Sequence, residues 1–268
     1  MTKIVDEFNN LPFTKRELLK QVQSQVNRPI IALFWTGSRI NNLARLDSDY
    51  DVLAITNVTN EDLLNFNHYR ETVKSKLYSK DLEIKVIDII SLYQSLSKSN
   101  WILLEALSQR PISTDQYFQP LFATLSDSNW LISSCPSHYT KAAIGQSLSI
   151  LTRIRHNHPR WRHDIYYIVK LNNYLQQFTD NSTIYGNIWH LTTKDLKDVQ
   201  LARHVIANHE LKDLNPDQAY PMVQDLVNNL KDTANKLEQV YQNYNTQPEL
   251  TELFSHWLFN QKGLTTND

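Results

Sequence analysis

The sequence predicts an α+β fold in which a mixed α/β domain over residues 1–118 precedes an all-helical domain over residues 119–268. Three short segments with the apolar or alternating pattern of strands lie before residue 90. From about residue 120 onward the apolar residues recur at helical spacing, without a convincing strand pattern. Only 4 glycines occur among the 268 residues, which also favours a helix-rich architecture.

The first domain is expected to begin with a helix followed by two strands. A helix is predicted over residues 11–28, because Thr14 and Glu17 fit a T-x-x-E capping box ahead of an apolar stripe. The segment Ile30–Trp35 is apolar, β-branched and aromatic throughout, which predicts a buried strand. The segment Tyr50–Thr56 has the same character and predicts a second strand.

Two further helices and a third strand complete the predicted α/β domain. A helix is expected to begin at Asn60, with an apolar stripe formed by Leu63, Leu64, Tyr69, Val73 and Leu77. The apolar residues of Leu82–Ile89 alternate with Glu83 and Lys85, which is typical of a strand with two different faces. A helix over residues 90–108 is predicted to end before the Arg-Pro pair that follows it.

The second half of the chain is predicted to be helical. Five segments there have apolar residues at helical spacing: 138–155, 164–178, 193–209, 216–244 and 249–260. The segment 216–244 has a proline at its first turn, where its missing N–H is tolerated. The change from mixed to purely helical patterning near residues 115–130 is the predicted domain boundary.

Composition excludes several classes of protein. The chain has 27 basic and 28 acidic side chains, so any contact with nucleic acid must come from a local patch. Hydrophobic residues make up 41%, which excludes intrinsic disorder. Cys135 is the only cysteine, so an intramolecular disulfide is impossible. The first residues lack the apolar core of a signal peptide, and no apolar run is long enough to cross a bilayer. A cytoplasmic protein without a membrane partner is expected.

A Gly-Ser turn and an Asp-x-Asp pair carry the chemical argument. Gly37 and Ser38 follow the first predicted strand, where a glycine lets the backbone approach a ligand and a serine can donate to a phosphate. Asp49 and Asp51 begin the next strand, and a period of two places both carboxylates on one face. Such a pair repels unless a cation lies between, and Mg²⁺ prefers oxygen ligands. Glu83, on a neighbouring strand, is the expected third carboxylate.

These residues resemble the DNA polymerase β nucleotidyltransferase superfamily, whose signature is a strand, Gly-Ser, a spacer of about ten residues and Asp-x-Asp. The string Gly37-Ser38-Arg39 to Asp47-Ser48-Asp49-Tyr50-Asp51 is similar to a bacterial and phage family of predicted nucleotidyltransferases that reads G-S-R-x-x-G-L-A-x-x-x-S-D-Y-D. The resemblance is strong over residues 31–107 and loose over residues 138–230. It departs at Asn42, where the family usually has glycine, and at Lys170, where arginine is common.

The resemblance implies roles for individual residues. Asp49, Asp51 and Glu83 would bind two Mg²⁺ ions, with an NTP as the substrate. Gly37 and Ser38 would hold the β- and γ-phosphates, while Arg39 and Lys170 would neutralise charge. Asn100 would lie near the nucleotide. Asp88 is the alternative third carboxylate, although it also suits the cap of the following helix.

A basic segment in the helical half is the second candidate site. It holds four arginines and a tryptophan with no acidic residue among them: Arg153, Arg155, Arg160, Trp161 and Arg162. The arginines are candidates for phosphate contacts, and the tryptophan for stacking on a base. The alternative is a solvated loop between helices with the tryptophan in the core.

The function expected from these residues is transfer of a nucleoside monophosphate from an NTP to a hydroxyl group, with release of pyrophosphate. The acceptor is an RNA or tRNA end, a protein side chain or a small molecule, and a toxin that modifies such a target shares the same chemistry. The alternative is a catalytically silent module of the same fold that binds nucleotide or RNA, as an antitoxin-like regulator does. The sequence indicates neither the base of the NTP nor the oligomeric state.

Overall fold

The computed structural model describes residues 11–37, 39–40, 48–65, 67–98, 100–107, 109–126, 136–161, 164–165, 168, 171, 215–240 and 247–261. Within these ranges the chain is α+β, with strands in the first half and helices in the second, as predicted. It divides into two compact units, residues 1–126 with 247–268, and residues 127–246. This division differs from the predicted boundary after residue 118, which falls inside a helix, Phe118–Leu125.

The first unit contains a five-stranded sheet with the order β3-β4-β2-β1-β5. Its strands are β1 (Ile30–Trp35), β2 (Tyr50–Thr56), β3 (Arg70–Leu77), β4 (Lys80–Asp88) and β5 (Ser113–Thr114). The β2–β4 pair is parallel and the other pairs are antiparallel. The three strands predicted from the sequence are therefore the three central ones, and the two edge strands are additional.

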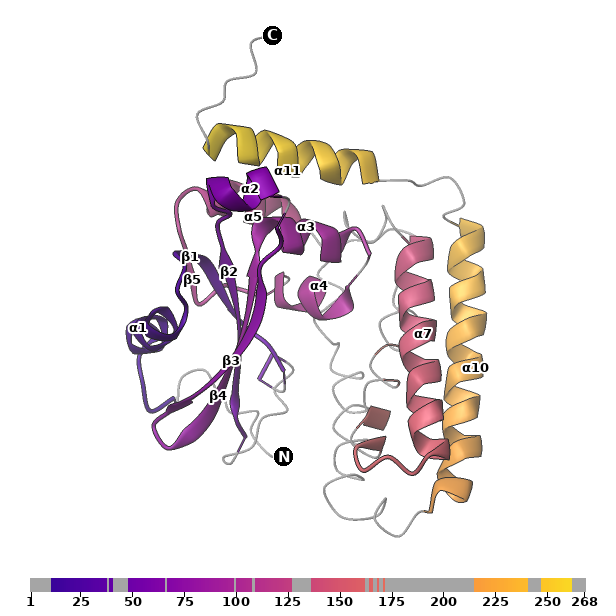
Figure 1. Ribbon diagram of the computed structural model, residues 1–268. Helices are drawn as coiled ribbons and strands as arrows, with labels where there is room; N and C mark the ends of the chain where they lie inside the picture. The colour runs from indigo at the N-terminus through magenta and orange to yellow at the C-terminus, as the bar shows by residue number, and fades with distance from the viewer. Residues whose placement is uncertain are drawn as a thin grey trace, which may run out of the picture. The chain divides into compact units, whose positions relative to one another are not determined.

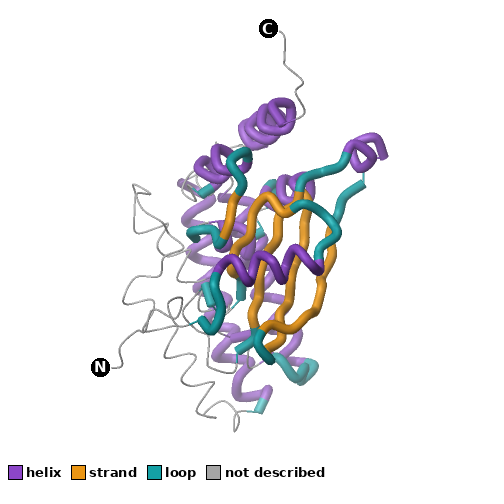
Figure 2. The backbone as a smooth tube through the Cα atoms, turned by 90° about the vertical axis from the view of Figure 1, so that its left-hand side faces the viewer, coloured by secondary structure: helices purple, strands orange, loops and turns teal. Residues whose placement is uncertain are grey.

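One face of the sheet is covered by helix α1 (Lys15–Gln25), which lies across it in Figure 2. The predicted capping box is present, since the Thr14 side chain and the Glu17 carboxylate each bind the other's backbone N–H. The alternating apolar residues of β2 and β4 meet the helix in one core, formed by Leu18, Val22, Leu33, Trp35, Val52, Ile84 and Val86 among others. We call this the α1 face.

The opposite face of the sheet is covered in part by helices α3 (Ile89–Leu96), α4 (Trp101–Leu107) and α5 (Phe118–Leu125). The ring centroid of Phe34, on β1, lies 5.5 Å from the ring centroid of Phe122, on α5. Helix α11 (Gln247–Gln261) belongs to the same unit, and the Trp257 indole donates to the Tyr117 carbonyl at 2.8 Å. We call the face of the sheet opposite α1 the α3 face. It carries the odd-numbered side chains of β2 and β4.

The prediction of a helix from Asn60 to Leu77 was wrong over most of its length. Helix α2 covers only Asn60–Asn65, and residues Arg70–Leu77 form the edge strand β3. Val73 and Leu77 are four residues apart, a spacing that suits a helix and a strand equally well. The β3–β4 hairpin then closes through Tyr78 and Ser79, which both have positive φ, at 48° and 66°.

The single helix predicted over residues 90–108 is divided into α3 and α4. Asp88 caps α3 by accepting a hydrogen bond from the Ser91 N–H. Asn100 begins α4 in the same manner, since its Oδ1 accepts from the N–H groups of Ile102 at 3.1 Å and Leu103 at 3.3 Å. A second N-terminal cap inside the predicted helix thus marks the break.

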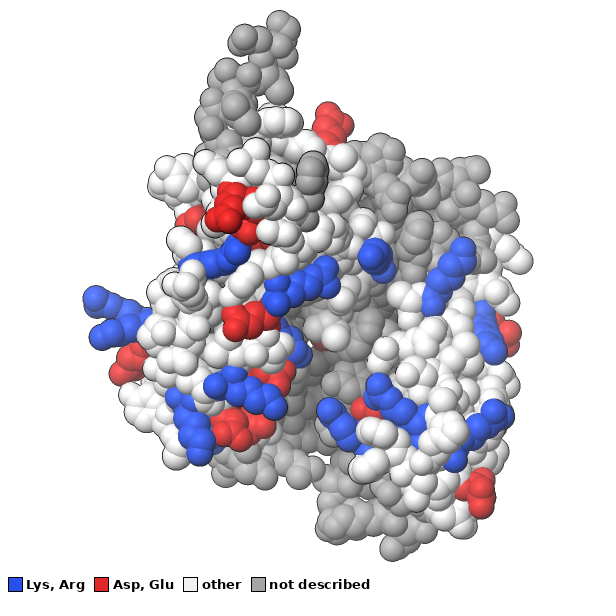
Figure 3. Space-filling view, viewed as in Figure 1, with Lys and Arg blue, Asp and Glu red and all other residues white. Residues whose placement is uncertain are grey.

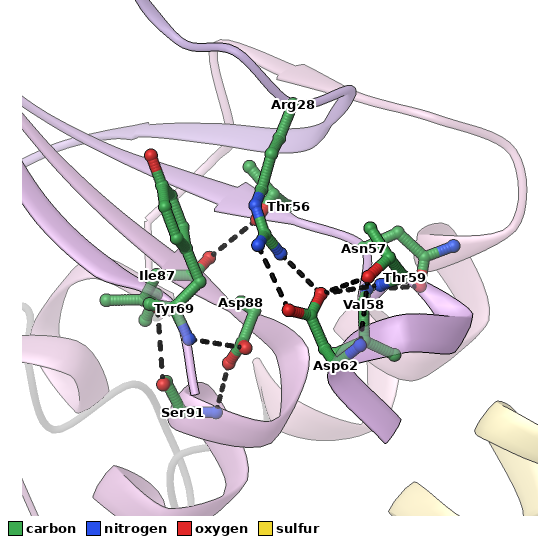
Figure 4. Close-up of polar contacts among 10 residues, drawn as sticks. All are labelled: Arg28, Thr56, Asn57, Val58, Thr59, Asp62, Tyr69, Ile87, Asp88 and Ser91. Atoms are coloured by element: carbon green, nitrogen blue, oxygen red, sulfur yellow. Dashed lines mark hydrogen bonds and ion pairs between the residues drawn. The ribbon is translucent and has the colours of Figure 1, made fainter. Parts of the chain in front are cut away.

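A polar network lies near the carboxyl end of β2 (Figure 4). The Arg28 guanidinium donates to both oxygens of Asp62, at 2.7 and 3.1 Å, and lies 4.0 Å from the centroid of the Tyr69 ring. The Thr59 N–H and hydroxyl also donate to the Asp62 carboxylate, and the Asp62 N–H donates to the Thr59 hydroxyl at 3.0 Å, so Thr59 caps α2 in a capping box. Arg28 and Thr59 hold the pKa of the Asp62 carboxyl far below its usual range. This ion pair ties α2 to the segment between α1 and β1.

The second unit, within the described residues, is built on α7 (Pro136–Arg155) and α10 (Pro216–Val240). These are the helices predicted over 138–155 and 216–244, and they share a buried core with Trp161 and Ile168. The helix predicted over 193–209, and most of that over 164–178, lie outside the described residues. None of the helices in the described ranges has the length and apolar character needed to cross a membrane.

Candidate active site

The Gly37 turn and the Asp51 carboxylate are in direct contact. The Thr36 N–H donates to the Asp51 carbonyl at 2.9 Å, which continues the β1–β2 pairing to the end of both strands. Gly37 has φ of +69°, a backbone conformation that is unfavourable for residues with a Cβ atom. A Cβ at this position would lie 2.2 Å from Oδ2 of Asp51. Glycine is therefore required both by the backbone conformation and by the carboxylate against it.

Glu83 is the register partner of Asp51 in the parallel β2–β4 pair. Partners on adjacent parallel strands lie about 4.8 Å apart and point to the same face. Both carboxylates therefore point to the α3 face, near the amino ends of their strands. Helices α3 and α4 lie beside the other half of these strands (Figure 1). Both side chains are only partly buried, which leaves the pair accessible.

Asp49 precedes β2 and is exposed. It is two residues before Asp51 and adds to the negative charge around it. Burial is the main cause of a raised pKa at the Asp51 carboxyl, and the charges of Glu83 and Asp49 raise that pKa further. The Lys85 ammonium is the largest influence that lowers it. The ionised Asp51 carboxylate thus lies where additional positive charge would be stabilising.

The donors at this position suit a hard divalent cation. Asp49, Asp51 and Glu83 offer carboxylate oxygens, and Gly37 leaves open the space that a Cβ would fill beside Asp51. The Thr36 hydroxyl is buried and has no hydrogen-bond partner among the described residues. Nevertheless, no three His, Cys, Asp or Glu side chains in the described ranges are grouped closely enough to hold a metal ion. The three-carboxylate site accordingly stays a prediction, in which Asp51 and Glu83 are the pair already side by side.

Asp88, the alternative third carboxylate, is placed elsewhere. It lies at the other end of β4, where its register partner is Thr56, and its parity directs it away from the face of Glu83. Its two oxygens accept from the N–H groups of Ser91 at 2.6 Å and Tyr69 at 2.7 Å (Figure 4). The side chain is fully buried. Asp88 therefore caps α3 and also binds the backbone at Tyr69, just before β3.

The Arg39 guanidinium packs against an aromatic ring, and its charge lowers the pKa of the Asp51 carboxyl. Its guanidinium carbon lies 4.4 Å from the centroid of the Tyr50 ring, and Tyr50 packs on the α1 face. One guanidinium nitrogen donates to the Ser48 carbonyl at 3.2 Å, so Arg39 joins the two ends of the loop between Gly37 and Asp49. Only 8% of Arg39 is exposed. In this conformation it closes the loop, and a phosphate contact by Arg39 remains a prediction.

The remaining predicted nucleotide-binding residues are not brought to the carboxylate pair by any described contact. Ser38 and Lys170 lie outside the described residues. Asn100 is exposed and its side-chain oxygen caps α4. The sequence patterns did not single out Thr36 and Lys85. Their positions just after β1 and on β4 place both side chains on the same face of the sheet as Asp51 and Glu83.

The basic segment of the second unit is only partly available for a ligand. Arg153 forms an ion pair with Asp164, and Trp161 is fully buried in the core. Stacking of Trp161 on a base is therefore excluded in this structure, and the alternative of a core tryptophan is the correct one. Arg155 and Arg160 are exposed, and Arg155 lies 4.9 Å from the Tyr220 ring centroid. Arg162 lies outside the described residues.

Comparison with known proteins finds a family whose sequence model matches more than half of the chain. The sequence model of a family described as RNA repair pathway DNA polymerase beta family matches residues 14–174. No curated protein matches the chain. A solved structure of a nucleotidyltransferase-like protein from Exiguobacterium sibiricum 255-15 aligns with 95% of this chain and 80% of its own, at 10% identity and a TM-score of 0.33. A likeness at that level supports no conclusion about this chain.

Proposed function

The chain belongs to the RNA repair pathway DNA polymerase beta family, within the polymerase β nucleotidyltransferases, and from this premise we propose that it is a Mg²⁺-dependent enzyme that transfers a nucleoside monophosphate from an NTP to an RNA hydroxyl. The observation that carries the proposal is the register pairing of Asp51 with Glu83 beside the Gly37 turn. The RNA acceptor is supported by the family description alone. A cytoplasmic location is part of the proposal.

The proposed reaction forms a bond between the acceptor oxygen and the α-phosphorus. The bond from that phosphorus to the oxygen that bridges it to the β-phosphate breaks, pyrophosphate leaves with that oxygen, and the acceptor hydroxyl gives its proton to solvent. Asp49, Asp51 and Glu83 would hold the Mg²⁺ ions, which when bound supply neutralising charge and lower the pKa of the hydroxyl. Gly37 and Ser38 would present backbone N–H groups to the leaving phosphates.

The proposal has a direct test in labelled nucleotides. Each α-³²P-labelled NTP is incubated with Mg²⁺, cell extract and RNA bearing a free 3′-hydroxyl, with the wild type beside Glu83→Gln and Asp88→Asn. Label transfer by wild type and Asp88→Asn, but not by Glu83→Gln, is the expected result. Transfer to protein or a small molecule instead would redirect the acceptor, and full transfer by Glu83→Gln would refute the site.

The alternative function is a catalytically silent nucleotide- or RNA-binding module of the same fold. The observation on its side is that the three carboxylates do not form a metal-binding group within the described ranges. NTP binding without transfer in any of the four reactions, and with no effect of Glu83→Gln, would favour this alternative.

Arg160 and Arg162, in the basic segment of the second unit, are proposed to contact RNA phosphates. Replacing Arg160 and Arg162 by alanine should weaken RNA binding and reduce the slope of log affinity against log salt by about 2, because two phosphate contacts are lost. NTP binding measured by calorimetry should not change. RNA affinity that is unchanged and insensitive to salt would show that this segment is ordinary solvated surface.

A further inference from the structure

Lys85 lies beside the carboxylate pair on the same face of the sheet. It follows Glu83 by two residues on β4, so the two side chains point to the same side. Its Nζ is 3.5 Å from Oε1 of Glu83, with 45% of the lysine side chain and 34% of the glutamate side chain exposed. Its register partner is Leu53, the next residue after Asp51 on that face of β2.

Two like charges on neighbouring strands need a counter-charge when no metal is bound. Asp51 and Glu83 are register partners, at a strand separation of about 4.8 Å. Lys85 forms an ion pair with Glu83 and lowers the pKa of the Asp51 carboxyl, so its one positive charge acts on both members. Figure 3 shows basic and acidic side chains interleaved on the surface over β3 and β4.

We propose that Lys85 is an internal counter-cation for the Asp51–Glu83 pair, and that a divalent metal ion must displace its ammonium group in order to bind. This inference rests on the proposed function, because it assumes that the two carboxylates are metal ligands. An ammonium group and a divalent ion compete for the same oxygens and repel each other. Lys85 therefore weakens metal binding in the absence of nucleotide, when the triphosphate that would share the ion is missing.

Lys74 provides a matched control. It is the antiparallel register partner of Glu83 on β3, so it lies on the same face of the sheet. Unlike Lys85, it forms no ion pair with any residue that the structure describes, and its side chain is exposed. A charge that acts only through the general field of the protein should have similar effects at both positions, whereas a displaced contact is specific to Lys85.

The test is a calorimetric titration of Mn²⁺ into the full chain without nucleotide, comparing wild type, Lys85→Met, Lys85→Arg, Lys74→Met and Asp51→Asn. Methionine is an unbranched side chain close in volume to the lysine side chain, and it carries no charge. Lys85→Met should bind Mn²⁺ roughly three- to tenfold more tightly than wild type, and Lys74→Met by less than about twofold. Lys85→Arg should stay close to wild type, and Asp51→Asn should lose the site.

A second measurement separates the proposal from a merely structural role. Metal-free Lys85→Met should melt at a lower temperature than wild type, because the carboxylates repel each other, and saturating Mn²⁺ should abolish that difference. Equal or weaker Mn²⁺ binding by Lys85→Met, or equal gains at Lys85 and Lys74, would overturn the inference. Wild type that binds Mn²⁺ no better than Asp51→Asn would instead overturn the proposed metal site itself.

Discussion

Substitution of Gly37 by alanine should damage both the backbone turn and the carboxylate that lies against it. At φ of +69° an alanine costs about 1–2 kcal/mol, because its Cβ approaches the neighbouring carbonyl. For a chain of this size that corresponds to a fall in melting temperature of roughly 2–8 °C. The new Cβ would also lie 2.2 Å from Oδ2 of Asp51, so that carboxylate must move by about 1 Å to reach van der Waals contact.

A displacement of that size in a catalytic group costs about 10²-fold in rate. The assay is nucleotidyl transfer at saturating NTP together with Mn²⁺ affinity, so that loss of rate and loss of metal binding are both recorded. Retention of wild-type rate, Mn²⁺ affinity and melting temperature by Gly37→Ala would refute the placement of Asp51 against the turn.

Gly145 is the matched control for this substitution. It is an exposed residue inside α7, and an added Cβ there would meet nothing within 4 Å. Gly145→Ala should therefore raise stability by about 0.5–1 kcal/mol and leave transfer unchanged, because alanine is the better helix former. The same change of atoms is thus expected to have opposite signs at the two glycines.

Further predictions concern four carboxylates. Asp51→Asn relieves repulsion within the pair and should raise the melting temperature of the metal-free protein by roughly 2–5 °C while abolishing transfer; a lower melting temperature would contradict the account. Asp88→Ala should cost about 1–2 kcal/mol in urea unfolding through loss of the α3 cap, with Mn²⁺ affinity unchanged, whereas Glu83→Gln should lose Mn²⁺ affinity with little change in stability. Arg28 lowers the pKa of the Asp62 carboxyl, so the ionised carboxylate stabilises the folded state at pH values above the ordinary pKa of 3.8. This contribution to the free energy of unfolding is lost as the pH falls below that value. The stability difference between wild type and Asp62→Asn should therefore shrink in acid, and a difference independent of pH would show that the ion pair is not its origin.

The central strands and their faces were predictable because their patterns were unambiguous. In β4 the alternation of Leu82, Ile84 and Val86 with Glu83 and Lys85 specified both the strand and the face that each residue occupies. Strand β3 was not predictable in this manner, since Val73 and Leu77 fit two periods. Only the register with β4 resolves it, and that register comes from a hairpin closed by Tyr78 and Ser79 without glycine.

The candidate site was predictable in its residue types and only partly in its contacts. Parity alone placed Asp51 and Glu83 on the same face, but their direct pairing depends on the parallel β2–β4 connection, which no local pattern encodes. The orientation of Arg39 was not predictable either. Its guanidinium packs on Tyr50 because the opposite face of β2 is aromatic there, and a motif position says nothing about which face a loop residue takes.

The most direct test of the central claim is transfer of ³²P from an α-labelled NTP to RNA by wild type and by Asp51→Asn, with Mg²⁺ and with EDTA. We predict labelled RNA and released pyrophosphate only for wild type with Mg²⁺, because the ionised Asp51–Glu83 pair is required to hold the ion. Equal labelling by Asp51→Asn, or labelling that persists in EDTA, would contradict the assignment of this carboxylate pair as the metal-binding centre of a nucleotidyltransferase.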